Sequence, residues 1–99
     1  MKAYGFHPEA REELREAAFY YESQRTGLGR RFALAVLDAV RRIRVNPSLY
    51  REVEPRIRQC RVLRFPYGLI YRNRSGRVEI LAVMHLGRKP RYWRDRKGE

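Results

Sequence analysis

The chain has 99 residues, 43% of them hydrophobic, and a formal net charge of +12. This length suits one compact domain over residues 1–99, and the apolar content is compatible with folding, so the high charge does not by itself imply disorder. Residues 1–24 carry five acids and three bases, a net charge of −2, so residues 25–99 carry +14. The expected partners are therefore anionic, either nucleic acid or an acidic protein.

Cys60 is the only cysteine, which excludes an intrachain disulfide and a cysteine-based metal site and favours a reducing compartment. No apolar run of signal-peptide length begins the chain, and the longest late run, residues 80–84, is too short to cross a membrane. We expect a cytoplasmic protein without a membrane partner. His7 and His85 lie far apart in sequence and no glycine-rich phosphate loop is present, so no metal or cofactor is expected.

Residues 2–6 are typical of a short strand. A helix is predicted from Pro8 to about Gln24, because proline suits a first helical position and the acids that follow suit the first turn. His7, directly before Pro8, fits the start of this helix. Apolar residues then recur at helical spacing: Ala10, Leu14, Ala17, Ala18 and Tyr21.

Gly27 and Gly29 mark a turn, after which residues 28–45 form a second amphipathic pattern. Asn46 and Pro47 end it, because proline disfavours a helical conformation in the residue before it. Two helices joined by so short a turn form a hairpin. The region that follows, with Pro47 and Pro55, is typical of a loop.

Three strands are predicted at residues 57–65, 67–73 and 78–86, separated by Pro66 and by the stretch at 73–76. In the last strand, Val78, Ile80, Ala82 and Met84 form the all-apolar set that we expect to face the helices. The fold class is α+β, with an N-terminal strand, a two-helix hairpin and then a curved antiparallel sheet of three to four further strands, in two layers. Residues 88–99 form a basic tail that is too polar to make a core.

Most of the basic residues are arginine, which accounts for twenty of the 23 cations. Its planar guanidinium binds phosphate or carboxylate through two parallel hydrogen bonds and stacks on rings. The late strands and tail therefore predict a nucleic-acid or target-binding surface, with an ordinary solubilising face as the alternative. The candidate residues are Arg61, Arg64, Arg72, Arg88, Arg91, Trp93, Arg94 and Arg96.

His85, Arg88 and Tyr92 are the candidate catalytic residues. Metal-independent cleavage of RNA needs a base, a cation for the developing charge and an acid. Arginine stays protonated, so His85 or Tyr92 would have to move the protons. The alternative for His85 is a histidine that only forms a hydrogen bond at a strand end.

Three segments together resemble the RelE/ParE superfamily of bacterial toxins: FHPEAREEL at the first helix, RVLRFPYGLIYRN at 61–73 and VEILAVMHLGRKPRYWRDR at 78–96. The resemblance implies the toxin of a type II toxin–antitoxin module, bound by an antitoxin in a hetero-oligomer. It also implies a five-strand antiparallel sheet, counting a strand near 51–53, with the first strand beside the last. The expected antitoxin contacts are Leu14, Tyr21, Phe32 and Tyr71.

The superfamily contains ribosome-dependent mRNA endonucleases, similar to RelE, and noncatalytic inhibitors of DNA gyrase, similar to ParE. The endonuclease roles would map onto Arg61 or Arg64, Arg88 and Tyr92. The lysines frequent in RelE-like sites are absent, and Trp93 competes with Tyr92 for the aromatic position. The long hairpin and the FPY and IYR phrases favour the gyrase inhibitors. For a gyrase inhibitor that binds through its basic tail, truncation after Leu86 is expected to abolish toxicity while antitoxin binding persists. A plain interaction module without toxicity is the third possibility.

Overall fold

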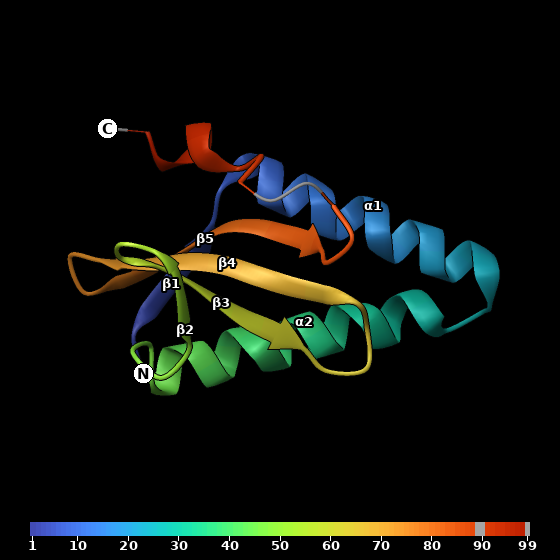
Figure 1. The fold of residues 1–99 in the computed structure, drawn as a ribbon. Helices are drawn as coiled ribbons and strands as arrows, with labels where there is room; N and C mark the ends of the chain where they lie inside the picture. The colour runs from blue at the N-terminus through green and yellow to red at the C-terminus, as the bar shows by residue number, and fades with distance from the viewer. Residues whose placement is uncertain (89–90, 99) are drawn as a thin grey trace.

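The computed structural model describes residues 1–88 and 91–98. Both helices lie against one face of a five-stranded sheet, and the two chain ends lie at the same end of the molecule (Figure 1). The elements in chain order are β1 (Ala3–Phe6), α1 (Pro8–Gln24), α2 (Leu28–Val45), β2 (Arg51–Glu54), β3 (Ile57–Val62), β4 (Tyr67–Arg74), β5 (Arg77–His85) and the 3₁₀ turn η1 (Arg94–Lys97). The α+β prediction is confirmed. Strand β2, which the residue pattern assigned to a loop, is the one that the resemblance implied.

The strand order is β1-β5-β4-β3-β2, so the first strand lies beside the last as expected. Strands β2 to β5 pair antiparallel, but β1 pairs parallel with β5, from Ala3 opposite Arg77 to Phe6 opposite Ile80. The expectation of a wholly antiparallel sheet is therefore wrong at this edge. The two strands are joined by a long crossover connection that contains both helices and strands β2 to β4, and such a connection lets the chain enter β5 in the same direction as β1.

Side-chain hydrogen bonds cap the start of both helices. His7 caps α1, since its Nδ1 accepts a hydrogen bond from the Glu9 amide at 3.1 Å, which confirms its place at the helix start. Glu22 accepts hydrogen bonds from the Gly27 and Gly29 amides and so satisfies the start of α2. A Cβ at Gly29 would lie 2.4 Å from the Ala18 carbonyl oxygen, so the close approach of the helices requires glycine there.

The main core lies between the helices and the sheet. Phe32 of α2 is fully buried and packs against Tyr21, Phe65 and Tyr67, with ring centroids 4.9 to 5.2 Å away. Cys60 is also buried in this core, and burial raises the pKa of its thiol. The same core holds Val36, Ala39, Val40, Ile43, Val62, Leu69, Tyr71, Val78, Ile80 and Val83.

A β-bulge reverses the alternation of β5. Tyr71 lies opposite Ile80 and Ile70 lies opposite Ala82, which leaves Leu81 as the extra residue. One extra residue moves every later side chain to the other face. Val78 and Ile80 face the helices as predicted, but Ala82 and Met84 belong to the core on the opposite face, so that part of the prediction is wrong.

The described part of the tail covers this second face of the sheet. Trp93 is 2% exposed and packs with buried residues of β3, β4 and β5, namely Ile57, Ile70, Leu81, Ala82 and Met84. The prediction of a tail too polar to contribute to a core is therefore wrong. The aromatic side chains of the tail pack against the sheet, while its charged side chains lie at the edge of this second core. Among the described residues, no helix is both long and apolar enough to cross a membrane.

Candidate functional site

The predicted target-binding arginines lie at two opposite ends of the sheet. Arg61 lies near the end of β3 and Arg64 in the turn to β4, where Tyr67 pairs with His85 at the end of β5. Arg88 follows β5 at the same end. Arg72 lies near the far end of β4, where it pairs with Glu79 at 2.5 Å and donates to the Lys97 carbonyl. The structure therefore does not bring the whole predicted set into one surface.

His85 is exposed beside the β3–β4 turn. Its Nδ1 accepts a hydrogen bond from the Gly87 amide at 2.9 Å, and its ring lies edge-on to Tyr67 with centroids 5.1 Å apart. This bond places the proton of the neutral ring on Nε2. Nε2 is thus the nitrogen that His85 can offer to a partner.

Tyr92 lies between two guanidinium groups. The Arg88 and Arg96 carbons lie 3.7 and 5.0 Å from its ring centroid. Its hydroxyl oxygen is buried and has no hydrogen-bond partner among the described residues. Burial first, and the nearby Glu13 carboxylate second, raise the pKa of Tyr92. A buried phenol with a raised pKa is a poor group for moving a proton at neutral pH.

The three candidate catalytic side chains do not form one connected site. Arg88 stacks on Tyr92 and lies 3.7 Å from the Glu13 carboxylate, whereas His85 packs on Tyr67. Within the described residues, no hydrogen bond joins the His85 ring to either Arg88 or Tyr92. The convergence that their closeness in sequence suggested is therefore not observed.

Glu13 is the acid around which the tail is arranged, and sequence reasoning treated it only as a helix-start residue. Its carboxylate accepts hydrogen bonds from both terminal nitrogens of Arg96 at 2.9 Å and from the Val83 amide at 2.9 Å. Arg96 also donates to the Leu81 carbonyl at 3.1 Å. Beyond the end of β1, Glu13 and Arg96 thus supply hydrogen-bond partners for the backbone groups of Val83 and Leu81 at the open edge of β5.

The other tail residues of the predicted set also make contacts inside the chain. Trp93 is buried, Arg91 donates to the Val53 carbonyl at 3.1 Å, and Arg94 lies 3.5 Å from Glu54. The Arg96 side chain is only 9% exposed. In this conformation Trp93 and Arg96 hold the fold together and offer no surface to a target.

Two of the four expected antitoxin contacts are fully buried and the other two are partly buried. Phe32 and Tyr71 are fully buried, and the Tyr71 hydroxyl donates to the Pro47 carbonyl. Leu14 and Tyr21 are partly buried against the main core. Phe32 and Tyr71 are therefore core residues. Phe32 belongs to the amphipathic stripe of α2, which is the side that faces the sheet, and Tyr71 is on the face of β4 that the helices cover.

Other apolar side chains of the hairpin are exposed. On α1 these are Phe19, 78% exposed, and Tyr20; on α2 they are Leu34, Leu37 and Val45. Outside the hairpin, Leu63 after β3 is exposed as well. A hollow of about 660 Å³ between the helices is lined by Ala18 and Phe19, with Glu12, Glu16 and Arg30 among the charges around it. In the sequence, this exposed apolar surface is marked by the apolar residues that lie outside the main apolar stripe of each helix.

No group of three or more potential metal-ligating side chains occurs among the described residues.

Residues 4–90 match the family described as "ParE toxin of type II toxin-antitoxin system, parDE". The comparison with curated proteins found no match. A solved structure described as "Chromosomal ParDE TA system from P. aeruginosa" has a similar fold, with a TM-score of 0.63 and 18% identity, covering 87% of this chain and 97% of that chain.

Proposed function

The chain belongs to the ParE toxin family of the parDE type II toxin–antitoxin system, and we propose that it arrests growth by inhibiting DNA gyrase without chemistry of its own. A cognate antitoxin neutralises it in a toxin–antitoxin complex. The observation that carries the noncatalytic part is the burial of the Tyr92 hydroxyl, which raises its pKa. It leaves His85 as the one member of the predicted trio that presents an exposed side chain of the type used for proton transfer.

Cleavage of RNA by its own 2′-hydroxyl needs one group that takes a proton and another that gives one. Arg88 can stabilise negative charge but stays protonated. With Tyr92 buried beneath Arg88 and Arg96, the predicted trio lacks a second proton-transfer group. Binding and blocking a protein target needs no such pair.

The antitoxin is expected to bind the outer side of the helical hairpin. Exposed Phe19 and Leu34 offer the apolar anchors that protein interfaces use, and the net charge of +12 favours an acidic partner. An amphipathic segment lying along the hollow between α1 and α2 would place its apolar face on Phe19. Because Glu12, Glu16 and Glu22 outnumber Arg15 and Arg30 around the hollow, the acidic residues of the segment are expected to lie outside it.

One observation favours a ribosome-dependent mRNA endonuclease as the second candidate. His85, with its Nε2 available, lies at the same end of the sheet as Arg61, Arg64 and Arg88. In such an enzyme these arginines would hold phosphates and His85 would transfer a proton, with water as its counterpart.

The variant His85→Ala separates the two candidates. We expect it to arrest growth as strongly as the parent chain, because a gyrase inhibitor needs no proton transfer from His85. In an endonuclease, loss of a proton-transfer group costs about 100- to 10,000-fold in rate. Growth after induction and the integrity of cellular transcripts are measured together.

Arg25→Ala serves as the control, since Arg25 is exposed at the hairpin loop. Circular dichroism verifies that both variants are folded. Cleaved transcripts in cells arrested by the parent chain, with arrest and cleavage both lost in His85→Ala, would contradict the proposal. Harmless expression of the parent chain without an antitoxin would contradict it as well, in favour of a plain interaction module.

A further inference from the structure

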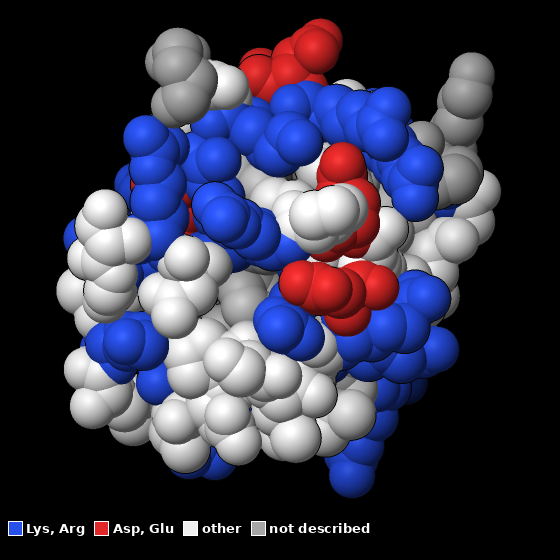
Figure 2. Space-filling model, turned by 60° about the vertical axis from the view of Figure 1, so that its left-hand side comes forward, with Lys and Arg blue, Asp and Glu red and all other residues white. Residues whose placement is uncertain are grey.

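A cationic hollow lies at the end of the sheet opposite His85. It has a volume of about 520 Å³ and is formed by the β2–β3 turn, the β4–β5 hairpin and η1. Its polar lining consists of Arg56, Arg72, Asn73, Arg74, Ser75 and Lys97. In Figure 2, where this end comes forward, lysine and arginine side chains spread over the face and fewer acidic ones lie between them.

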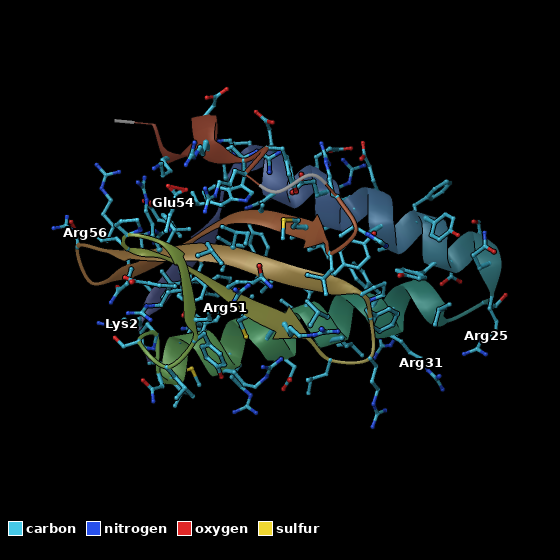
Figure 3. All side chains as sticks on the ribbon, in the orientation of Figure 1. Lys2, Arg25, Arg31, Arg51, Glu54 and Arg56 are labelled. Carbon is cyan, nitrogen blue, oxygen red and sulfur yellow. The ribbon has the colours of Figure 1, made fainter. Side chains whose placement is uncertain are left out.

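Tight turns hold these cations in place. Arg56 has a φ of 68° in the β2–β3 turn, and its side chain extends from that end of the molecule (Figure 3). Ser75 and Gly76, with φ of 55° and 74°, form the two-residue turn of the β4–β5 hairpin. That hairpin places Arg74 directly opposite Arg77.

Acidic side chains hold the base of the hollow but are not part of its lining. Arg72 donates its Nε to Glu79 and its Nη2 to the Lys97 carbonyl, which leaves Nη1 outside these bonds. The Lys97 ammonium lies 3.6 Å from Glu54. These contacts fix Arg72 and Lys97, so an anion would meet cations that are already ordered.

We propose that this hollow binds the phosphodiester backbone of a nucleic acid. Ile57, the only large apolar residue of the lining, is 2% exposed, so a peptide would find no apolar anchor there. Asn73, Ser75 and the arginines are the donors that contact phosphates in nucleic-acid complexes. Six of the exposed large apolar residues, which suit a protein partner, lie along the hairpin and in the β3–β4 turn, namely Phe19, Tyr20, Leu34, Leu37, Val45 and Leu63. Met1 and Leu49 are exposed as well, but none of these residues lines the hollow.

This inference goes beyond the proposed function and does not depend on it, since a chain with any target, or with none, would bind phosphates in the same way. Duplex DNA and single-stranded RNA carry the same backbone chemistry. The site lies apart from the outer side of the hairpin, so an antitoxin bound there would leave it open.

Fluorescence anisotropy of the full chain with labelled probes tests the proposal. The probes are a short mixed-sequence duplex DNA, a single-stranded RNA of equal length and a polyglutamate peptide. The double variant Arg56→Ala/Arg74→Ala is compared with Arg25→Ala/Arg31→Ala, which removes the same charge at the opposite end of the molecule (Figure 3). Circular dichroism verifies that both variants fold.

We expect Arg56→Ala/Arg74→Ala to weaken binding of DNA or RNA about tenfold and to lower the slope of log affinity against log salt by about 2. Arg25→Ala/Arg31→Ala should change the affinity less than about twofold, because those arginines lie outside the hollow. Tighter binding of one nucleic acid identifies the source of the phosphates. Equal losses in the two variants would overturn the proposal in favour of a diffuse charge effect. Binding of polyglutamate, but of neither nucleic acid, through Arg56 and Arg74 would overturn it in favour of an acidic protein.

Discussion

Replacing Glu13 by Ala is expected to lower the free energy of unfolding by about 3 kcal/mol, because it removes the buried carboxylate that holds the Arg96 guanidinium and leaves only the exposed Glu9 carboxylate, 3.3 Å away, as its acidic partner. The side chains of Glu13 and Arg96 are 13% and 9% exposed, and two hydrogen bonds of 2.9 Å join them. The Val83 amide loses its acceptor in the same variant. Most small domains have a total stability of only about 5 to 15 kcal/mol, so the loss is a large fraction. Urea unfolding measures it.

Glu12→Ala is the matched control, one residue away on the same helix. Glu12 pairs with Arg15, and these side chains are 52% and 73% exposed. An exposed pair of this kind contributes at most about 1 kcal/mol. The double variant Glu13→Leu/Arg96→Met removes both charges and should recover much of the stability. Equal small effects of Glu13→Ala and Glu12→Ala would show that the tail is not held by this pair.

Replacing Trp93 by Ala is expected to destabilise the protein by about 3 to 5 kcal/mol, because it empties the centre of the core on the second face of the sheet. Trp93 is the only tryptophan, so its own fluorescence reports whether the tail is docked. In the parent chain we expect the emission of a buried indole, shifting to the red as urea unfolds the protein. Thermal and urea unfolding of the variant measure the loss.

Tyr20→Ala is the control for Trp93→Ala, since Tyr20 is 57% exposed. Its effect should stay within about 0.5 kcal/mol. A red-shifted emission in the native parent chain, together with no loss of stability in Trp93→Ala, would contradict the docked tail.

These two contacts change the meaning of a truncation after Leu86. The sequence suggested that such a truncation would remove toxicity and spare antitoxin binding. In the structure it removes Trp93 from one core and Arg96 from the edge of β5. We therefore expect the truncated chain to lose stability, and a loss of toxicity would not by itself place the target site in the tail. Single exposed residues such as Arg94, whose side chain is 54% exposed, are the better probes.

Much of the fold could be predicted because its determinants are local. The proline and acids at residues 8–13, the amphipathic stripe of α2 and the Asn46–Pro47 stop each act within a few residues. Strand β2 was missed by the residue pattern because it is only four residues long and carries three charges. It forms because its backbone pairs with β3 at the edge of the sheet, and this interaction between segments is not visible in the local sequence.

The face of each β5 side chain could not be predicted because the bulge at Leu81 depends on pairing with β4. Strict alternation assumes that every residue has an opposite partner, and Leu81 has none in the ladder. The signal that could have indicated it is the unbroken apolar run at residues 80–84, which is buried on both faces.

The candidate site was harder to predict, since it depends on where the tail lies. Closeness in sequence suggested that His85, Arg88 and Tyr92 converge, whereas Glu13 of α1 organises Arg88 and Arg96 around the Tyr92 ring. Glu13 lies 83 positions from Arg96 in the chain, and no local pattern connects them. The charge pattern indicated an anionic partner but not that the arginines divide between the two ends of the sheet.

We propose that this member of the ParE toxin family acts on gyrase and cleaves no RNA, and two parallel reactions test this most directly. Purified parent chain is added to a gyrase supercoiling reaction and, in parallel, to an in vitro translation reaction whose transcript is followed on a gel. We predict that supercoiling stops while the transcript stays intact. Supercoiling at the full rate beside a cleaved transcript would contradict the claim.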